Sequence, residues 1–267
     1  MKAMKLFKKS EPYERKQALI GEGTDYHVYD ETKKEKILWF LMGFAAGAVV
    51  LYIFYANIII SLIAGAGVGV AFIPIRRKQV IAKRKQKLTN QFKSLLETLA
   101  TSIGAGKNVY DSFSAAIYDL AVQYGEESDI VKEVRLISTG LVNNFQIEDL
   151  LKNFADRSEI VDVYNFADVF ATCYKKGGDI KEVVKNSSSI IGDKIEVQME
   201  LETMVSGQKS TQNIMLVMPL IIIVMLRSMG GGLVDLSTPV GILSVTIAIV
   251  IFVIAYFISK KILDIKL

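Results

Sequence analysis

The sequence predicts an all-α integral membrane protein, with four transmembrane helices arranged as two hairpins that flank one cytoplasmic helical-bundle domain. Three observations predict this class. Hydrophobic residues make up 51% of the 267 positions, which is a high share for a water-soluble chain. Four stretches are long and apolar enough to span a bilayer. The region between the second and third stretches repeats apolar residues at three- and four-residue intervals, which is the period of a helix face.

The first predicted hairpin has spans at 37–55 and 58–75, separated only by Ala56 and Asn57. At about 1.5 Å per residue, one helix over both spans would be almost twice as long as the apolar core of a bilayer, so a turn is expected between them. A cleaved signal peptide is not expected, because the first apolar run begins at residue 37 and is too long. Residues 1–36 form a polar cytoplasmic segment to which the sequence assigns no function.

The second predicted hairpin has spans at 214–229 and 240–258, followed by a short tail, 259–267. Pro219 removes a backbone donor from the third span and is expected to kink it. Arg227 lies near the outer end of that span, where its side chain is expected to reach the interface.

Lysine and arginine residues predict the orientation. They precede the first span, follow the fourth, and form a dense basic run after the second, whereas the two turns carry almost no charge. By the positive-inside rule, both termini and the middle segment, 76–212, are cytoplasmic. The basic run also suits contact with anionic lipid, and both roles can hold together. Its members are Arg76, Arg77, Lys78, Lys83, Arg84, Lys85 and Lys87.

Apolar residues in the middle segment predict amphipathic helices that pack into a small bundle. Three sets recur at helical spacing: Leu88, Phe92, Leu95, Leu96, Leu99 and Ile103; Ile130, Val134, Ile137 and Leu141; Val163, Phe166, Phe170 and Tyr174.

A repeated stop-and-start pattern divides these helices. "NVYDSF", "QIEDLL" and "DIKEVV" each begin with a polar residue and place an acid three residues later, as in a capping box. Each follows a glycine or asparagine that can end a helix in the left-handed conformation, and we expect Gly178 to adopt it. A phosphate-binding loop would need a preceding strand and a different glycine spacing, so nucleotide binding is not expected. The stop and cap residues are Gly104, Gly106, Asn108, Asp111, Gly177, Gly178, Asp179 and Glu182.

Two further patterns suggest contact surfaces. Asp193, Glu196 and Glu200 form an acidic stripe on one face of a long helix, which is either a docking site for a basic partner or an ordinary solvated face. Small residues at four-residue spacing in the first hairpin favour close packing of its helices, although glycines are also common in such helices by chance. These are Gly43, Gly47, Gly65 and Gly69.

The order of "LLETLATSIGAGKNVYDSFSAAI", "LVNNFQIEDLLKNFADRS" and "VFATCYKKGGDIKEVVKNSSSII", followed by a long helix into "NIMLVMPLIIIVML", resembles the type II secretion system F domain family. The resemblance is nearest to the TadB subfamily of the tight-adherence (Flp) pilus assembly system, with TadC as its sibling. It implies an inner-membrane platform that contacts a cytoplasmic hexameric secretion ATPase and helps to move pilin subunits into a filament. Several relatives carry two copies of the domain, so the single copy here implies that the platform needs a sibling platform protein or a homo-oligomer.

Two other functions are less consistent with the sequence. A membrane subunit of a transporter, the main alternative, usually has ionisable residues at mid-bilayer, and here only Arg227 lies in a span. An intramembrane hydrolase would need a mid-span catalytic set, which is absent from the sequence. With one histidine, His27, and one cysteine, Cys173, we expect no enzymatic activity, no cofactor and no metal site. Nucleic acid is not an expected partner, because residues 88–212 carry 19 acids against 12 bases.

Overall fold

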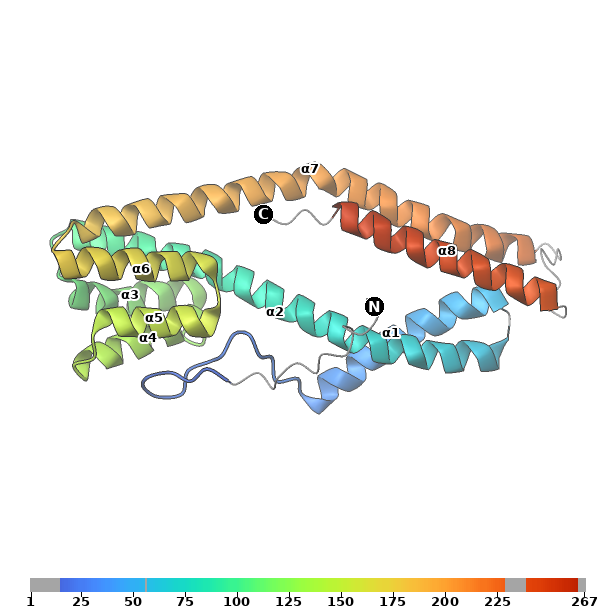
Figure 1. The fold of residues 1–267 in the computed structure, drawn as a ribbon, viewed down its shortest axis with the longest axis horizontal. Coiled ribbons are helices and arrows are strands. Elements are labelled where there is room, and N and C mark those ends of the chain that lie inside the picture. Colours follow the sequence, from blue (N-terminus) through green and yellow to red (C-terminus); the bar gives the residue numbers. More distant parts are fainter. Residues whose placement is uncertain (1–14, 56, 229–238, 264–267) are drawn as a thin grey trace, which may run out of the picture. The chain divides into compact units, whose positions relative to one another are not determined.

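The computed structural model describes residues 15–55, 57–228 and 239–263. These residues form eight α-helices and no strand, which confirms the predicted all-α class (Figure 1). The helices are α1 (Lys33–Tyr55), α2 (Ile58–Gly104), α3 (Val109–Tyr124), α4 (Asp129–Val142), α5 (Ile147–Ser158), α6 (Val161–Lys176), α7 (Ile180–Ser228) and α8 (Pro239–Leu263).

Three of the described helices, α1, α2 and α7, are long and apolar enough to cross a membrane. In α8 the described apolar stretch is shorter, Leu243–Tyr256. The chain is therefore a membrane protein by the length and composition of its helices, and the fourth span stays a prediction. The predicted loop 230–239 falls almost entirely outside the described residues, as do Met229 and the end of the tail.

The turn between α1 and α2 lies where the length of the apolar region predicts it. Helix α1 ends at Tyr55 and α2 begins at Ile58. Asn57 caps α2, because its side-chain Oδ1 accepts a hydrogen bond from the backbone N–H of Ile59, at 3.0 Å.

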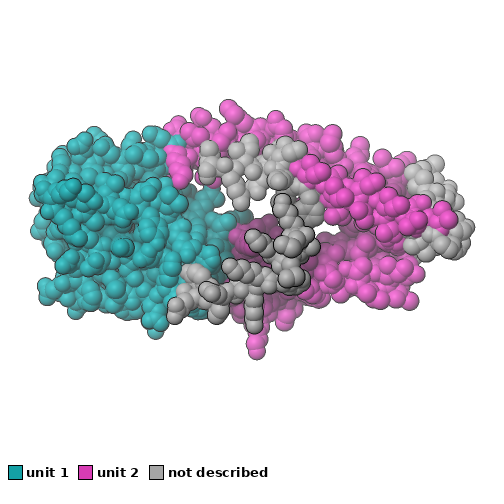
Figure 2. Space-filling view, in the orientation of Figure 1, with its two compact units in different colours: residues 1–29, 80–193 teal, residues 30–79, 194–267 magenta. Residues whose placement is uncertain are grey.

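The chain divides into two compact units, coloured separately in Figure 2. The first contains Val80–Asp193 together with the chain up to Tyr29, and the second contains Asp30–Gln79 and Lys194–Leu267. We call residues 80–193 the bundle. The predicted cytoplasmic domain, 76–212, extends further at both ends than this unit does. The difference arises because α2, with 47 residues, and α7, with 49, each continue unbroken across the boundary, which no change of secondary structure marks.

The predicted apolar faces form the core of the bundle. In Figure 1, α3 to α6 lie side by side. Phe92 of α2 makes edge-on aromatic contacts with Phe154 of α5 and Phe166 of α6, with ring centroids 6.0 and 5.5 Å apart. Ile103 and Tyr174, at the ends of their predicted faces, are only half-buried. The fully enclosed members include Leu88, Phe92, Leu96, Leu99, Ile130, Val134, Val163 and Phe170.

Candidate functional sites

The break between α6 and α7 is a helix stop followed by a cap, but its left-handed residue is not the expected one. Gly177 has a φ of 69°, and Gly178 is absent from the positive-φ glycines. The expectation for Gly178 was therefore wrong by one residue. The N–H of Gly178 instead bonds the carbonyl of Cys173 at 2.9 Å, and a Cβ at Gly178 would lie 2.5 Å from the Cys173 sulfur. Gly177 is needed at this corner for its left-handed conformation, and Gly178 because a side chain there would collide with Cys173.

Side-chain caps follow the two glycine-containing stops. Asn108 Oδ1 accepts from the Asp111 N–H at 2.8 Å, and Asp179 Oδ1 accepts from the Glu182 N–H at 3.1 Å. Gly104 ends α2, and Gly106 has a φ of 87° in the loop that follows. These residues shape the corners of the bundle.

The basic run does not act as one surface. Arg84 forms a two-pronged ion pair with Asp129, with N–O distances of 2.6 and 3.0 Å, and Lys85 reaches Glu159 at 3.4 Å. The hydrogen bonds that Arg84 donates to the Asp129 carboxylate are the main cause that raises the pKa of Arg84. Arg77 pairs with Glu31 at 3.3 Å, and Arg76 donates to Gln79. Arg77, Lys78, Lys83 and Lys87 have exposed side chains.

A buried ion pair that the sequence analysis missed joins α4 and α5. The carboxylate of Glu133 and the guanidinium of Arg157 are 1% and 2% exposed, and Arg157 Nη1 lies 2.7 Å from Glu133 Oε1, with a second bond from Nη2 to Oε2. Arg157 also donates from Nε to Asn153 at 2.9 Å. The sequence did contain a signal for this pair. Glu133 follows Ile130 by three residues, so an acid lies on a predicted apolar face, where it would need a basic partner.

The N-terminal segment binds at this ion pair. We call residues 15–29 the strap. Tyr26 is 1% exposed, its hydroxyl donates to Glu133 at 2.9 Å, and its backbone N–H donates to the Arg157 carbonyl at 3.0 Å. The guanidinium of Arg84 lies over the Tyr26 ring, 4.8 Å from its centroid. Burial and the nearby Glu133 carboxylate raise the pKa of Tyr26 well above its usual value, so its hydroxyl stays a donor.

A second anchor of the strap is Glu159, a left-handed residue with φ 49° just after α5. Its carboxylate meets Lys16 at 3.0 Å and His27 at 2.6 Å from the strap, and Lys85 from α2. Burial acts to raise the pKa of Glu159, but the three bases outweigh it and hold that pKa below its ordinary value. Lys16 Nζ also donates to the Asp156 carbonyl at 2.8 Å.

The acidic stripe is exposed on α7. Asp193 lies at the end of the first unit, and Glu196 and Glu200 lie at the start of the α7 part of the second. Their exposure is compatible with either a docking site or a solvated face.

The glycines of the first hairpin lie where α1 and α2 touch. A Cβ at Gly65 would be 3.0 Å from the backbone nitrogen of Ala48, and one at Gly43 would be 3.1 Å from the Cα of Gly69. A Cβ at Gly47 would meet Val68 at 2.8 Å. The two helices therefore approach so closely that side chains at these positions would force them apart.

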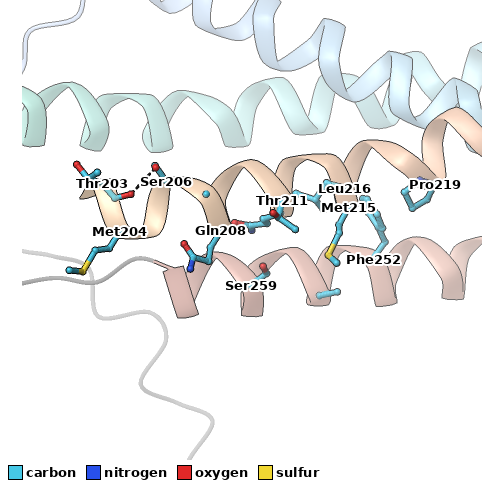
Figure 3. A pocket seen from close by; sticks show the side chains of 13 residues that line it. Thr203, Met204, Ser206, Gln208, Thr211, Met215, Leu216, Pro219, Phe252 and Ser259 are labelled. Atoms are coloured by element: carbon cyan, nitrogen blue, oxygen red, sulfur yellow. Dashed lines mark hydrogen bonds between the residues drawn. The ribbon is translucent and has the colours of Figure 1, made fainter. Parts of the chain in front are cut away.

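A groove of about 1020 Å³ lies between α7 and α8 in the second unit (Figure 3). Most of its polar lining lies along α7 before Met215, and Met215, Leu216 and Pro219 follow. Nearby in the same unit, Tyr55 of α1 and Thr246 of α8 share a hydrogen bond, with their oxygens 2.8 Å apart. The lining includes Thr203, Ser206, Gln208, Thr211, Gln212, Met215, Leu216, Pro219, Phe252 and Ser259.

No group of three or more histidine, cysteine, aspartate or glutamate side chains that could hold a metal ion occurs among the described residues. Comparisons with protein-family models, with curated proteins and with solved structures found no match for the chain.

Proposed function

We propose that the chain is a non-enzymatic inner-membrane platform of a type IV-like, tight-adherence pilus or secretion machine. In this role it couples a cytoplasmic hexameric ATPase to the extraction of pilin subunits and the assembly of a filament. The proposal rests on the order of the family-like motifs, and one structural observation supports it most. Helices α2 and α7 are each a single helix that combines a bundle segment with an apolar stretch of membrane-spanning length.

An unbroken helix can serve as a mechanical link, because its backbone hydrogen bonds resist bending more than a loop does. A force applied to the bundle would then reach the bilayer through two helices. Pro219, within the apolar part of α7, lacks a backbone donor and gives that helix a place to bend.

The proposed topology has four spans, with both termini and the bundle in the cytoplasm. Single cysteines placed at Asn144 and Asp235, in a chain whose Cys173 is replaced by serine, test it. In intact cells a membrane-impermeant thiol reagent should label the cysteine at 235 and spare the one at 144. Labelling at 144 without lysis would contradict the two-hairpin arrangement.

The acidic stripe is the proposed ATPase contact. Individual exposed ion pairs contribute only ~0.2–1 kcal/mol, so a fair test reverses all three charges, with Asp193, Glu196 and Glu200 changed to lysine. The matched control changes Asp119, Glu127 and Asp168, which are also exposed, to lysine. The stripe variant should lose ATPase capture while the control keeps it, and equal capture by both would move the contact elsewhere.

Two measurements on the wild-type chain separate the platform from the transporter alternative. Purification from membranes should retain a secretion ATPase identified by its sequence, and proteoliposomes containing the chain should show no solute flux. Flux without a bound ATPase would favour a transporter. Further proposed partners within the same machine are the pilin and a sibling platform protein or other copies of this chain.

A further inference from the structure

We propose that the strap is a peptide ligand that the chain carries in cis, and that it opens and closes on the bundle surface around Arg157 and Glu133, which we call the strap site, while the bundle stays folded. The proposal does not depend on the platform function. It assigns a peptide-binding site to the bundle, with a tyrosine as the anchor of its ligand, and a role to a segment whose sequence indicates none.

The strap site contacts both the backbone and one side chain of the strap. Arg157 accepts from the Tyr26 N–H through its carbonyl, and its guanidinium donates to the Thr24 carbonyl at 3.1 Å. Asn153 donates to the Gln17 carbonyl at 3.0 Å. Gly23 permits this approach, since a Cβ there would lie 2.9 Å from Arg157 Nη1. The strap is therefore held by backbone contacts together with one enclosed aromatic ring.

The strap can separate from the bundle because little apolar surface holds it. Its described residues, 15–29, contain no helix, and Tyr26 is their only buried hydrophobic side chain. Leu19 is 48% exposed. The bundle, in contrast, encloses more than a dozen large apolar side chains, so opening the strap exposes far less apolar surface than unfolding the bundle.

When the strap opens, no buried charged group is left without its counter-ion. Without the strap, Arg157 keeps its two-pronged contact with Glu133 and its bond to Asn153. Water can replace the Tyr26 hydroxyl and the Thr24 carbonyl in the vacated space. The strap site therefore tolerates an empty state, as a binding site for a detachable ligand must.

Hydrogen exchange on the purified full-length chain tests the proposal, with the Tyr26 amide as the reporter. This amide should exchange faster than the core amides of α4 and α5, because opening does not require global unfolding. Tyr26→Phe keeps the ring and removes the bond to Glu133, so it should accelerate exchange at position 26 by about tenfold, and position 26 should still exchange faster than the core amides. Tyr118→Phe removes the hydroxyl of a tyrosine that is 74% exposed on α3 and should change neither rate.

A second variant and a concentration series complete the test. Lys16→Gln weakens the other end of the strap at Glu159 and should also accelerate exchange at Tyr26, which should stay faster than exchange in the core. Rates independent of protein concentration are expected for a ligand held in cis, and slower exchange at higher concentration would assign the strap site to a second copy's strap and overturn the cis assignment. Equal exchange free energies for the Tyr26 amide and the core amides in the wild type would show that the strap unfolds only with the bundle and would overturn the proposal.

Discussion

The hydroxyl of Tyr26 donates a hydrogen bond to the carboxylate of Glu133, at 2.9 Å, and this bond joins residues 107 positions apart in the chain. Both side chains are 1% exposed. The bond links the N-terminal segment to a carboxylate that is already paired with Arg157. A polar cluster of this kind stabilises one arrangement of the chain, because each enclosed group depends on its partners.

The Glu133–Arg157 pair should be costly to break from one side. Glu133→Gln leaves the enclosed Arg157 charge without its counter-ion and should lower the free energy of unfolding by ~3–5 kcal/mol, seen as a lower midpoint in circular dichroism melts.

The double change Glu133→Leu with Arg157→Met removes both charges and should cost less than the two single changes together. Glu97→Gln breaks the exposed pair with Lys93 and serves as control, with an expected loss below ~0.5 kcal/mol. Equal small losses for Glu133→Gln and Glu97→Gln would contradict the burial of the pair.

Replacing Gly177 by a residue with a side chain should destabilise the protein, although there is open space around this position. No atom outside the immediate chain lies within 4 Å of a Cβ built there, but its φ of 69° is left-handed. Gly177→Ala should therefore destabilise the protein by ~1–2 kcal/mol, and Gly177→Asn should cost less, because asparagine adopts this conformation more readily. Gly207→Ala is the control, since Gly207 also has open space but lies within helix α7. That change should be neutral or stabilise by up to ~1 kcal/mol, and a loss equal to that of Gly177→Ala would argue against the left-handed assignment.

Acid should weaken the Glu159 anchor. The folded protein holds the Glu159 pKa below its ordinary value of 4.5, so the contribution of this carboxylate to stability is complete above that pH. It is lost as the pH falls through the lowered pKa. The melting temperature of the wild type should exceed that of Glu159→Gln at neutral pH, and the difference should shrink below about pH 4.5. A difference that stays constant over that range would mean that the charge of Glu159 does not hold the strap.

The first hairpin offers a matched pair of glycines in one helix. A Cβ at Gly65 would lie 3.0 Å from the Ala48 backbone, whereas no such neighbour lies within 4 Å of Gly67. Gly65→Leu should push α1 and α2 apart and cost ~1–3 kcal/mol, measured as a lower melting temperature in detergent. Gly67→Leu should be close to neutral. Equal melting temperatures for Gly65→Leu and Gly67→Leu would contradict the close contact at Gly65.

Local patterns in the sequence predicted most of the fold. The turn after Tyr55, the helix starts at Asn108 and Asp179, and the apolar faces of the bundle all depend on residues within a few positions of one another. Gly177 and Gly178 show where local reasoning ends, because either glycine can adopt a positive φ and the choice depends on the surrounding contacts.

The strap could not be predicted in the same way. It has no periodicity, and its partners Glu133, Arg157 and Glu159 lie more than 100 positions along the chain. The sequence also gave no sign that Arg84 and Lys85 of the basic run pair with Asp129 and Glu159 rather than facing lipid. Long-range polar contacts of this kind depend on the assembled fold, which composition and spacing do not encode.

The most direct test of the platform function is to count filaments on cells by electron microscopy after deletion of the gene. The account predicts that the deletion strain lacks the filament, that the wild-type chain restores it, and that the lysine variant of Asp193, Glu196 and Glu200 inserts in the membrane without restoring it. Normal filament numbers in the deletion strain would contradict the platform function itself.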